Sequence, residues 1–262
     1  MEYNKGRFRI MQAIILCGGK GTRLREVIGE RQKVMTAVQD TPFLVDVINY
    51  LKSYKITSVI FATGYKSDEV RSYFGDKYFF GVEVKYSEEK EPLGTGGAIR
   101  LALDKMKYDY VYVLNGDTLF KADLYKLKEN FMRLGACMSI ACKTIEDKSR
   151  YGTIKLDFSG ERTGGNKEDG ILTSFDEKVK GHHKHADETF INGGVYILRR
   201  DLIESIEPGK EISLEKDLMP KWLSEGKIIG GVLSDESFID IGTPESLKRY
   251  KDIKENEEVI DG

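Results

Sequence analysis

The chain has 262 residues, of which 40% are hydrophobic and 32% charged, and its formal net charge at pH 7 is −2. This balance is typical of a soluble globular chain, long enough for one large α/β domain or two small ones. The near-neutral charge provides no basic field for nucleic acid, and no apolar run approaches the roughly 18 residues that span a membrane. We therefore expect neither nucleic acid nor a membrane among the partners.

The N-terminus and the cysteines both indicate a cytoplasmic protein. Residues 1–10 are polar with scattered basic groups and lack the apolar core of a secretory signal, so we interpret them as an N-terminal extension. The three cysteines, Cys17, Cys137 and Cys142, form an odd and sparse set, which is typical of a reducing compartment. Cys137 and Cys142 are expected to be small buried hydrophobes, since they match neither a disulfide pair nor a CxxC metal half-site.

The first half of the chain alternates between apolar runs and helical patterns. Short apolar or alternating runs predict strands over Gln12–Cys17, Ser58–Thr63, Val82–Tyr86 and Tyr110–Leu114. Helix-start residues and helical spacing predict helices from near Thr22 and over Thr41–Tyr54, Ser67–Phe74 and Leu93–Met106. This order predicts an α/β fold with a Rossmann-like mixed, mainly parallel sheet flanked by helices.

The second half of the chain is richer in predicted strands. These lie over Cys137–Lys143, Tyr151–Phe158, Ile171–Phe175, Phe190–Leu198 and Gly231–Ile241. Helices are predicted over Ser213–Ser224 and Pro244–Lys254. We expect this half to add a smaller β-rich lid to one domain spanning residues 11–250, followed by a polar tail over residues 251–262.

A glycine-rich turn joins the first strand to the first helix, with the sequence CGGKGTRL at residues 17–24. Its glycines let the backbone approach a ligand closely, and the helix N-terminus favours an anion, so we expect a phosphate site. Leu24 stands where the dinucleotide pattern G-x-G-x-x-G needs its third glycine, and the P-loop pattern has no match. Arg23 offers a fork of donors to phosphate, and Lys33 is placed to return to the same crevice.

Two aspartates follow predicted strands. Asp117 follows Tyr110–Leu114, and Asp240 lies at the end of Gly231–Ile241. Ligands of open α/β sheets bind beyond the carboxyl ends of strands, so the glycine turn and Asp117 are expected to meet. Two carboxylates suit a Mg²⁺ ion that bridges nucleotide phosphates, although each aspartate alone is equally consistent with a helix cap or a turn. Lys178, next to Glu177, could hold a second anionic substrate or be an ordinary surface lysine.

Several separated motifs resemble those of one enzyme family. They are, in chain order, Leu16–Leu24 with Lys33-Val34-Met35, Glu91–Ala98, Asn115-Gly116-Asp117, Tyr151-Gly152, Glu177-Lys178, Asn192–Tyr196 and Asp240–Pro244. Together they resemble the sugar-1-phosphate nucleotidyltransferases, also called nucleotide-sugar pyrophosphorylases. The resemblance implies the nucleotide-diphospho-sugar transferase (GT-A-like) fold. It also implies transfer of a nucleoside monophosphate from a nucleoside triphosphate to a sugar 1-phosphate, with Mg²⁺ as cofactor and pyrophosphate as the second product.

The resemblance also implies a role for each matching residue. The catalytic cations would be Arg23 and Lys33. The nucleotide would be bound by Leu16, Gly18, Gly19, Gly21, Thr22, Gly94, Thr95 and Gly96. The sugar phosphate would be bound by Gly152, Glu177, Lys178, Asn192 and Gly194. The metal would be held by Asp117 and Asp240.

Two local features refine the resemblance. Cys17 stands where alanine is commoner and, with Glu91–Ala98, makes the chain look most like the D-glycero-α-D-manno-heptose-1-phosphate guanylyltransferases, which make GDP-heptose for bacterial surface polysaccharide. That resemblance implies GTP and D-glycero-α-D-manno-heptose 1-phosphate as substrates. Gln32 and Val34 stand where the family usually has prolines beside this lysine, which predicts a less rigid loop around Lys33.

Some alternatives stay open from the sequence. The sugar could be mannose, glucose or an N-acetylated sugar, and the nucleotide UTP, dTTP or CTP. The oligomeric state is also open, a homo-oligomer included. A further alternative, from a different functional class, is a non-catalytic regulatory protein that binds a nucleotide sugar. Such a protein could dispense with Arg23, Lys33 and the two aspartates, whereas all four are present.

Overall fold

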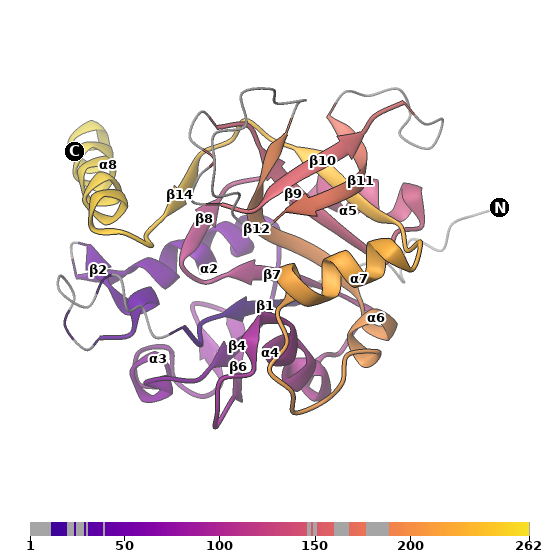
Figure 1. The fold of residues 1–262 in the computed structure, drawn as a ribbon. Coiled ribbons are helices and arrows are strands. Elements are labelled where there is room, and N and C mark those ends of the chain that lie inside the picture. Colours follow the sequence, from indigo (N-terminus) through magenta and orange to yellow (C-terminus); the bar gives the residue numbers. More distant parts are fainter. Residues whose placement is uncertain are drawn as a thin grey trace.

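The computed structural model describes residues 12–19, 24, 29, 31–38, 40–145, 148, 151–159, 168–176 and 189–261. Within these ranges the chain forms a ten-stranded mixed sheet covered by helices on both faces (Figure 1). Its strands are β1 Gln12–Leu16, β4 Ser58–Thr63, β5 Tyr78–Phe79, β6 Val82–Glu88, β7 Tyr110–Asn115, β9 Met138–Lys143, β10 Thr153–Asp157, β11 Asp169–Asp176, β12 Phe190–Arg199 and β13 Ile229–Leu233. This is the α/β class that the alternation of strands and helices predicts.

The strand order is β10-β11-β13-β9-β12-β7-β1-β4-β6-β5. Strand β1 is parallel to its neighbours β4 and β7, and β4 is parallel to β6. Antiparallel pairing of β12 with β7 connects the second half of the chain to the first. The strands expected to form a lid therefore extend the same sheet, in which β13 and β9 are also parallel and the other pairs are antiparallel.

Helices cover the two faces of this sheet. One buried cluster joins one face to α2 Phe43–Ser53, α3 Ser67–Phe74, α5 Leu124–Leu134 and α8 Pro244–Asp261. The other cluster joins the opposite face to α4 Gly94–Ala102, α6 Arg200–Glu204 and α7 Met219–Ser224. Among the helices of the described ranges, none combines the length and the apolar character needed to cross a membrane. Cys17, Cys137 and Cys142 are buried free thiols, as expected for the latter two.

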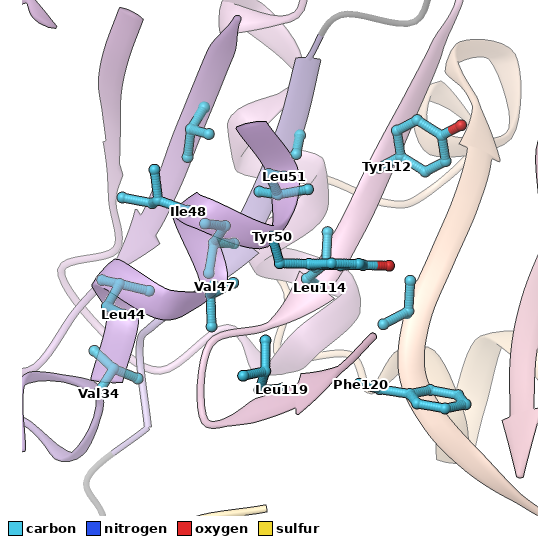
Figure 2. Close-up of a cluster of buried hydrophobic side chains, with 14 of the residues drawn as sticks. Val34, Leu44, Val47, Ile48, Tyr50, Leu51, Tyr112, Leu114, Leu119 and Phe120 are labelled. Atoms are coloured by element: carbon cyan, nitrogen blue, oxygen red, sulfur yellow. The ribbon is translucent and has the colours of Figure 1, made fainter. Parts of the chain in front are cut away.

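Helix α2 shows how the sequence pattern builds one layer. Its buried side chains recur at helical spacing, at Phe43, Leu44, Val47, Ile48 and Leu51. Figure 2 shows α2 side chains gathered with Leu114 of β7 and Leu119 of β8 Thr118–Phe120. Val34 joins the same cluster, so the segment that carries Lys33 is packed against the core.

The structure differs from the predicted elements in the last third of the chain. The single strand predicted over Gly231–Ile241 is wrong, because β13 ends at Leu233 and a separate strand, β14 Phe238–Asp240, pairs antiparallel with β8. The polar run at residues 234–237 separates the two apolar pieces. Helix α8 continues to Asp261, through the residues expected to form a polar tail.

Helix α5 is absent from the predicted elements. It begins after Asp123, whose carboxylate accepts hydrogen bonds from the N–H groups of Tyr125 and Lys126. Its buried residues, Leu124, Leu127, Asn130, Phe131 and Leu134, lie at helical spacing.

Candidate active site

The start of the glycine turn, residues 17–19, and Asp117 lie side by side because β1 and β7 are parallel neighbours. Leu16, at the end of β1, aligns with Asn115 at the end of β7. The N–H of Gly116 then donates to the Leu16 carbonyl at 2.9 Å. A Cβ on Gly116 would lie 2.7 Å from that carbonyl oxygen, so this close approach requires glycine. The two motifs predicted to share one edge of the sheet are thus adjacent.

The contact at Gly116 gives a stability prediction. We expect Gly116→Ala to lower the free energy of unfolding by about 1–3 kcal/mol, because the added methyl group must push β1 and β7 apart. Chemical denaturation measures this change. Gly19→Ala is the matched control, because its added Cβ would meet nothing within 4 Å, and we expect a change within about 0.5 kcal/mol. Equal losses for the two variants would contradict the prediction.

Lys33 and Asp117 form an ion pair at this edge of the sheet. Lys33 begins a short 3-10 turn, Lys33–Met35, and the exposed fractions of the two side chains are 15% and 35%. A small cavity of ≈ 50 Å³ lies here, lined by Leu16, Cys17, Gly19, Gln32, Lys33, Val34 and Asp117. A cation and a carboxylate are therefore held together beside the glycine turn, where the sequence predicts phosphate.

Gln32 fixes the backbone next to Lys33. Its side chain is buried, and the side-chain nitrogen donates to the carbonyls of Cys17 and, at 3.0 Å, Tyr65. The side-chain oxygen accepts the Lys33 N–H at 2.9 Å, and the backbone N–H of Gln32 donates to Glu69 at 2.9 Å. Hydrogen bonds to Cys17, Tyr65 and Glu69 thus connect Gln32 to three other segments, while the lower rigidity expected of this loop stays a prediction.

We expect Gln32→Ala to lower kcat by about 10–100-fold, because Lys33 would lose its fixed distance from the glycine turn. It should also lower the free energy of unfolding by about 1–3 kcal/mol, since buried carbonyls lose their donor. Gln12→Ala is the matched control. Gln12 is also buried, donates to Ser58 and the Lys105 carbonyl, and accepts the Lys107 N–H at the other end of β1. It should lose similar stability without the loss in kcat; equal losses in kcat would contradict the prediction.

Cys17 is not a candidate nucleophile despite its place in the turn. Its thiol is fully buried and donates to the Ile15 carbonyl at 3.5 Å. Burial raises the pKa of this thiol far above its ordinary value, and the charge of Asp117 raises it further. The thiol therefore stays protonated at neutral pH.

Glu89 lies between the glycine turn and the predicted nucleotide-binding turn at Leu93–Gly96. Its carboxylate accepts the Leu93 N–H at 3.1 Å. A Cβ on Gly18 would lie 2.6 Å from the same carboxylate, so the two turns are close neighbours. Burial raises the pKa of Glu89 above its ordinary value.

Three hydrogen-bond donors at the start of α4 have partners within the chain. The N–H groups of Gly96 and Gly97 donate to the Ile212 carbonyl at 2.8 and 3.2 Å. The hydroxyl of Thr95 donates to Glu215 at 2.6 Å. Gly94 has φ +68°, and a Cβ there would lie 2.6 Å from the Ile212 carbonyl oxygen. Because the Thr95 hydroxyl and the Gly96 N–H already donate to Glu215 and Ile212, they are not available as donors to a nucleotide. Thr95 and Gly96 would therefore contribute to a nucleotide site through the shape of the turn.

The described residues predicted to bind the sugar phosphate also cluster. The N–H of Asn192 donates to the Gly152 carbonyl at 3.0 Å, and the side-chain oxygen of Asn192 accepts the Gly194 N–H at 2.8 Å. Gly194 has φ +69°, and a Cβ there would lie 2.7 Å from the side-chain nitrogen of Asn115. The cluster therefore reaches the end of β7, two residues before Asp117.

Asp117 and Asp240 belong to neighbouring segments. Asp240 aligns with Thr118 in the pairing of β14 with β8, and the Ile241 N–H donates to the Asp117 carbonyl at 3.0 Å. One oxygen of Asp240 accepts the Gly242 N–H at 2.7 Å, and the other accepts the Tyr151 hydroxyl at 3.4 Å. Among the described residues, no group of three or more acidic, histidine or cysteine side chains could hold a metal ion. Two carboxylates nevertheless suit Mg²⁺, which commonly uses one or two carboxylates together with substrate phosphates.

Five predicted site residues lie outside the described residues, namely Gly21, Thr22, Arg23, Glu177 and Lys178. Two residues with several contacts in the site were missed by the sequence analysis. Glu89 follows a strand but belongs to none of the quoted motifs. Glu215 belongs to no motif, and only its contacts in the structure, with Thr95, Tyr196 and Ser213, identify it.

The chain belongs to the nucleotidyl transferase family, whose model matches residues 12–257. Its fold and the cation–carboxylate pair at the glycine turn agree with this class of enzyme.

Some relatives of this chain within the family have names that state a substrate. The D-glycero-alpha-D-manno-heptose 1-phosphate guanylyltransferase of Campylobacter jejuni is 41% identical over 240 residues, which cover 92% of this chain and 98% of the relative. The protein of the same name from Aneurinibacillus thermoaerophilus is 38% identical, with 91% and 96% covered. The crystal structure of HddC from Yersinia pseudotuberculosis superposes with a TM-score of 0.76 at 31% identity, covering 93% of this chain and 99% of that chain. HddC has also been solved in complex with GMP-PN.

Proposed function

We propose that the protein transfers GMP from GTP to D-glycero-α-D-manno-heptose 1-phosphate, releasing pyrophosphate and forming GDP-heptose. The structural observation that carries the reaction class is the Lys33–Asp117 pair beside the glycine turn, at the shared edge of β1 and β7. The choice of sugar and base is supported by the names of the two relatives at 41% and 38% identity and by the GMP-PN complex of HddC.

The chemistry requires alignment and charge neutralisation rather than a general base. A phosphate oxygen of the sugar 1-phosphate, already anionic at neutral pH, attacks the α-phosphorus of GTP. The bond from this phosphorus to the bridging oxygen of the β-phosphate breaks, and pyrophosphate leaves with that oxygen. Lys33 and Arg23 offset the repulsion between the two polyanions and the charge that develops in the transition state.

Asp117 and Asp240 would hold Mg²⁺, which supplies further positive charge at the phosphates. Lys178 would bind the phosphate of the sugar, while Gly152, Glu177, Asn192 and Gly194 surround its hydroxyl groups. The contacts of Asn192 with Gly152 and Gly194, and of Gly194 with Asn115, support placing the sugar next to this pair of carboxylates.

Pyrophosphate release tests the proposal. The purified protein is incubated with Mg²⁺, each of GTP, UTP, dTTP and CTP, and each of the 1-phosphates of heptose, mannose, glucose and N-acetylglucosamine. We expect the highest kcat/KM for GTP with D-glycero-α-D-manno-heptose 1-phosphate. Preference for another pair would refute the specificity. Nucleotide-sugar binding without turnover on any pair would instead indicate the regulatory class.

A further inference from the structure

A chain of hydrogen bonds joins the nucleotide-binding turn to the sugar side within the protein. Glu215 lies at its centre, and its carboxylate accepts a hydrogen bond from the Thr95 hydroxyl at 2.6 Å. These two residues are 120 positions apart in the sequence. The other oxygen of Glu215 accepts the Tyr196 hydroxyl at 3.1 Å. The Tyr196 hydroxyl in turn accepts the side-chain N–H of Asn192 at 2.8 Å.

Each hydrogen bond in this chain has a defined donor and a defined acceptor. The Leu214 N–H donates to the Thr95 hydroxyl oxygen at 2.8 Å, so the single hydroxyl proton of Thr95 goes to Glu215. Tyr196 is fully buried, and burial together with the charge of Glu215 raises its pKa well above the ordinary value. Its hydroxyl therefore keeps its proton and donates it to Glu215. Because the side-chain oxygen of Asn192 holds the Gly194 N–H, the orientation of this amide is also fixed.

The local backbone is irregular at two places along the chain of bonds. Glu215 belongs to a short π-helical segment, Leu214–Leu218, capped by the Ser213 hydroxyl, which accepts the Lys216 N–H at 3.0 Å. Such segments occur frequently at functional sites. On the other side, the pairing of β12 with β9 shifts register between Asn192 and Tyr196.

We propose that Glu215 is a positioning residue that couples the nucleotide and sugar-phosphate sites. The proposal rests on the proposed function for the identity of these sites. A nucleotide that orders the Thr95 turn also orders Glu215 and Tyr196, and so holds Asn192 in place for the sugar. The reverse holds for the sugar phosphate, since coupling between two binding sites is reciprocal.

Amide hydrogen exchange on the full-length protein tests the coupling independently of activity. We expect Tyr196→Phe to accelerate exchange of the Gly194 N–H, because Asn192 loses its partner. Glu215→Gln should accelerate exchange of both the Gly194 and the Leu214 N–H, because the carboxamide presents an NH2 donor, in place of an accepting oxygen, to one of the two hydroxyls. Tyr112→Phe is the matched control. Tyr112 is also buried, and its hydroxyl donates to the Leu124 carbonyl at 2.9 Å, away from these two amides.

Steady-state kinetics provides the second readout. Tyr196→Phe should raise the KM for the sugar 1-phosphate about tenfold at saturating GTP, and, because the coupling is reciprocal, it should also raise the KM for GTP measured at saturating sugar 1-phosphate. Glu215→Gln should raise both KM values. Exchange rates and KM values of Tyr196→Phe that match those of Tyr112→Phe would overturn the proposal. An unmodified protein with no turnover would refute the proposed function instead, and the exchange rates would still decide the role of Glu215.

Discussion

Lys33→Ala is expected to lower kcat by about 10²–10³-fold, the range seen when one preorganised donor to a developing negative charge is removed. The Lys33 side chain lines the same cavity as Cys17 and Gly19; its ammonium pairs with Asp117, and Gln32 anchors its backbone. Its charge therefore acts at a fixed point. We expect the KM for GTP to change less than about tenfold, since an interaction made mainly in the transition state affects kcat more than ground-state binding.

The measurement is initial-rate pyrophosphate release over a range of GTP concentrations. Lys77→Ala removes an exposed lysine elsewhere on the surface and controls for the change in net charge. A large rise in the KM for GTP with kcat unchanged would show that Lys33 serves binding alone. Rates equal to those of Lys77→Ala would remove Lys33 from the mechanism.

Asp117→Asn is expected to lower Mg²⁺-dependent turnover by about 10²–10³-fold while leaving the fold intact. The substitution removes one of two proposed metal carboxylates and also the ion-pair partner of Lys33. The side chain is 35% exposed, so the neutral amide can be solvated without a large loss of stability. Thermal unfolding should show a shift of only a few degrees.

Titration of Mn²⁺ in the presence of a non-hydrolysable GTP analogue separates metal binding from turnover. We expect Asp117→Asn to weaken Mn²⁺ binding at least about tenfold, whereas Asp104→Asn, an exposed aspartate away from the site, should not. Because Lys33 and Asp117 are in contact, their effects should not add. A double variant far worse than either single variant would show that the two residues act independently.

Much of the fold could be predicted because its signals are local. The run Ser58–Thr63 is apolar and buried on both faces, and β4 has those same bounds. Helix α5 also has local signals, since Asp123 caps its start, Gly135 follows its end and its buried positions lie at helical spacing, so its absence from the predicted elements is an omission rather than a limit of the sequence. The split between β13 and β14 depends on their partners, β9 and β8, and these contacts are distant in the sequence.

The candidate site could be predicted only in outline. The rule for carboxyl ends of parallel strands was sufficient to place Leu16 next to Asn115 and Asp117. No sequence pattern indicates that the Gln32 side chain donates hydrogen bonds to the carbonyls of Cys17 and Tyr65. Nor does any pattern indicate that Glu215 accepts hydrogen bonds from the hydroxyls of Thr95 and Tyr196. These contacts depend on how distant segments pack, so they become visible only in three dimensions.

The position of β13 has a consequence for synthesis of the chain. This strand is made after β9 and β11 but lies between them in the sheet. Until residue 233 has left the ribosome, β9 and β11 each present one row of unpaired backbone N–H and C=O groups. The nascent chain thus carries these two open strand edges from the completion of β11 at residue 176 until the completion of β13 at residue 233, and its sheet becomes continuous only when one of the last strands inserts into the interior.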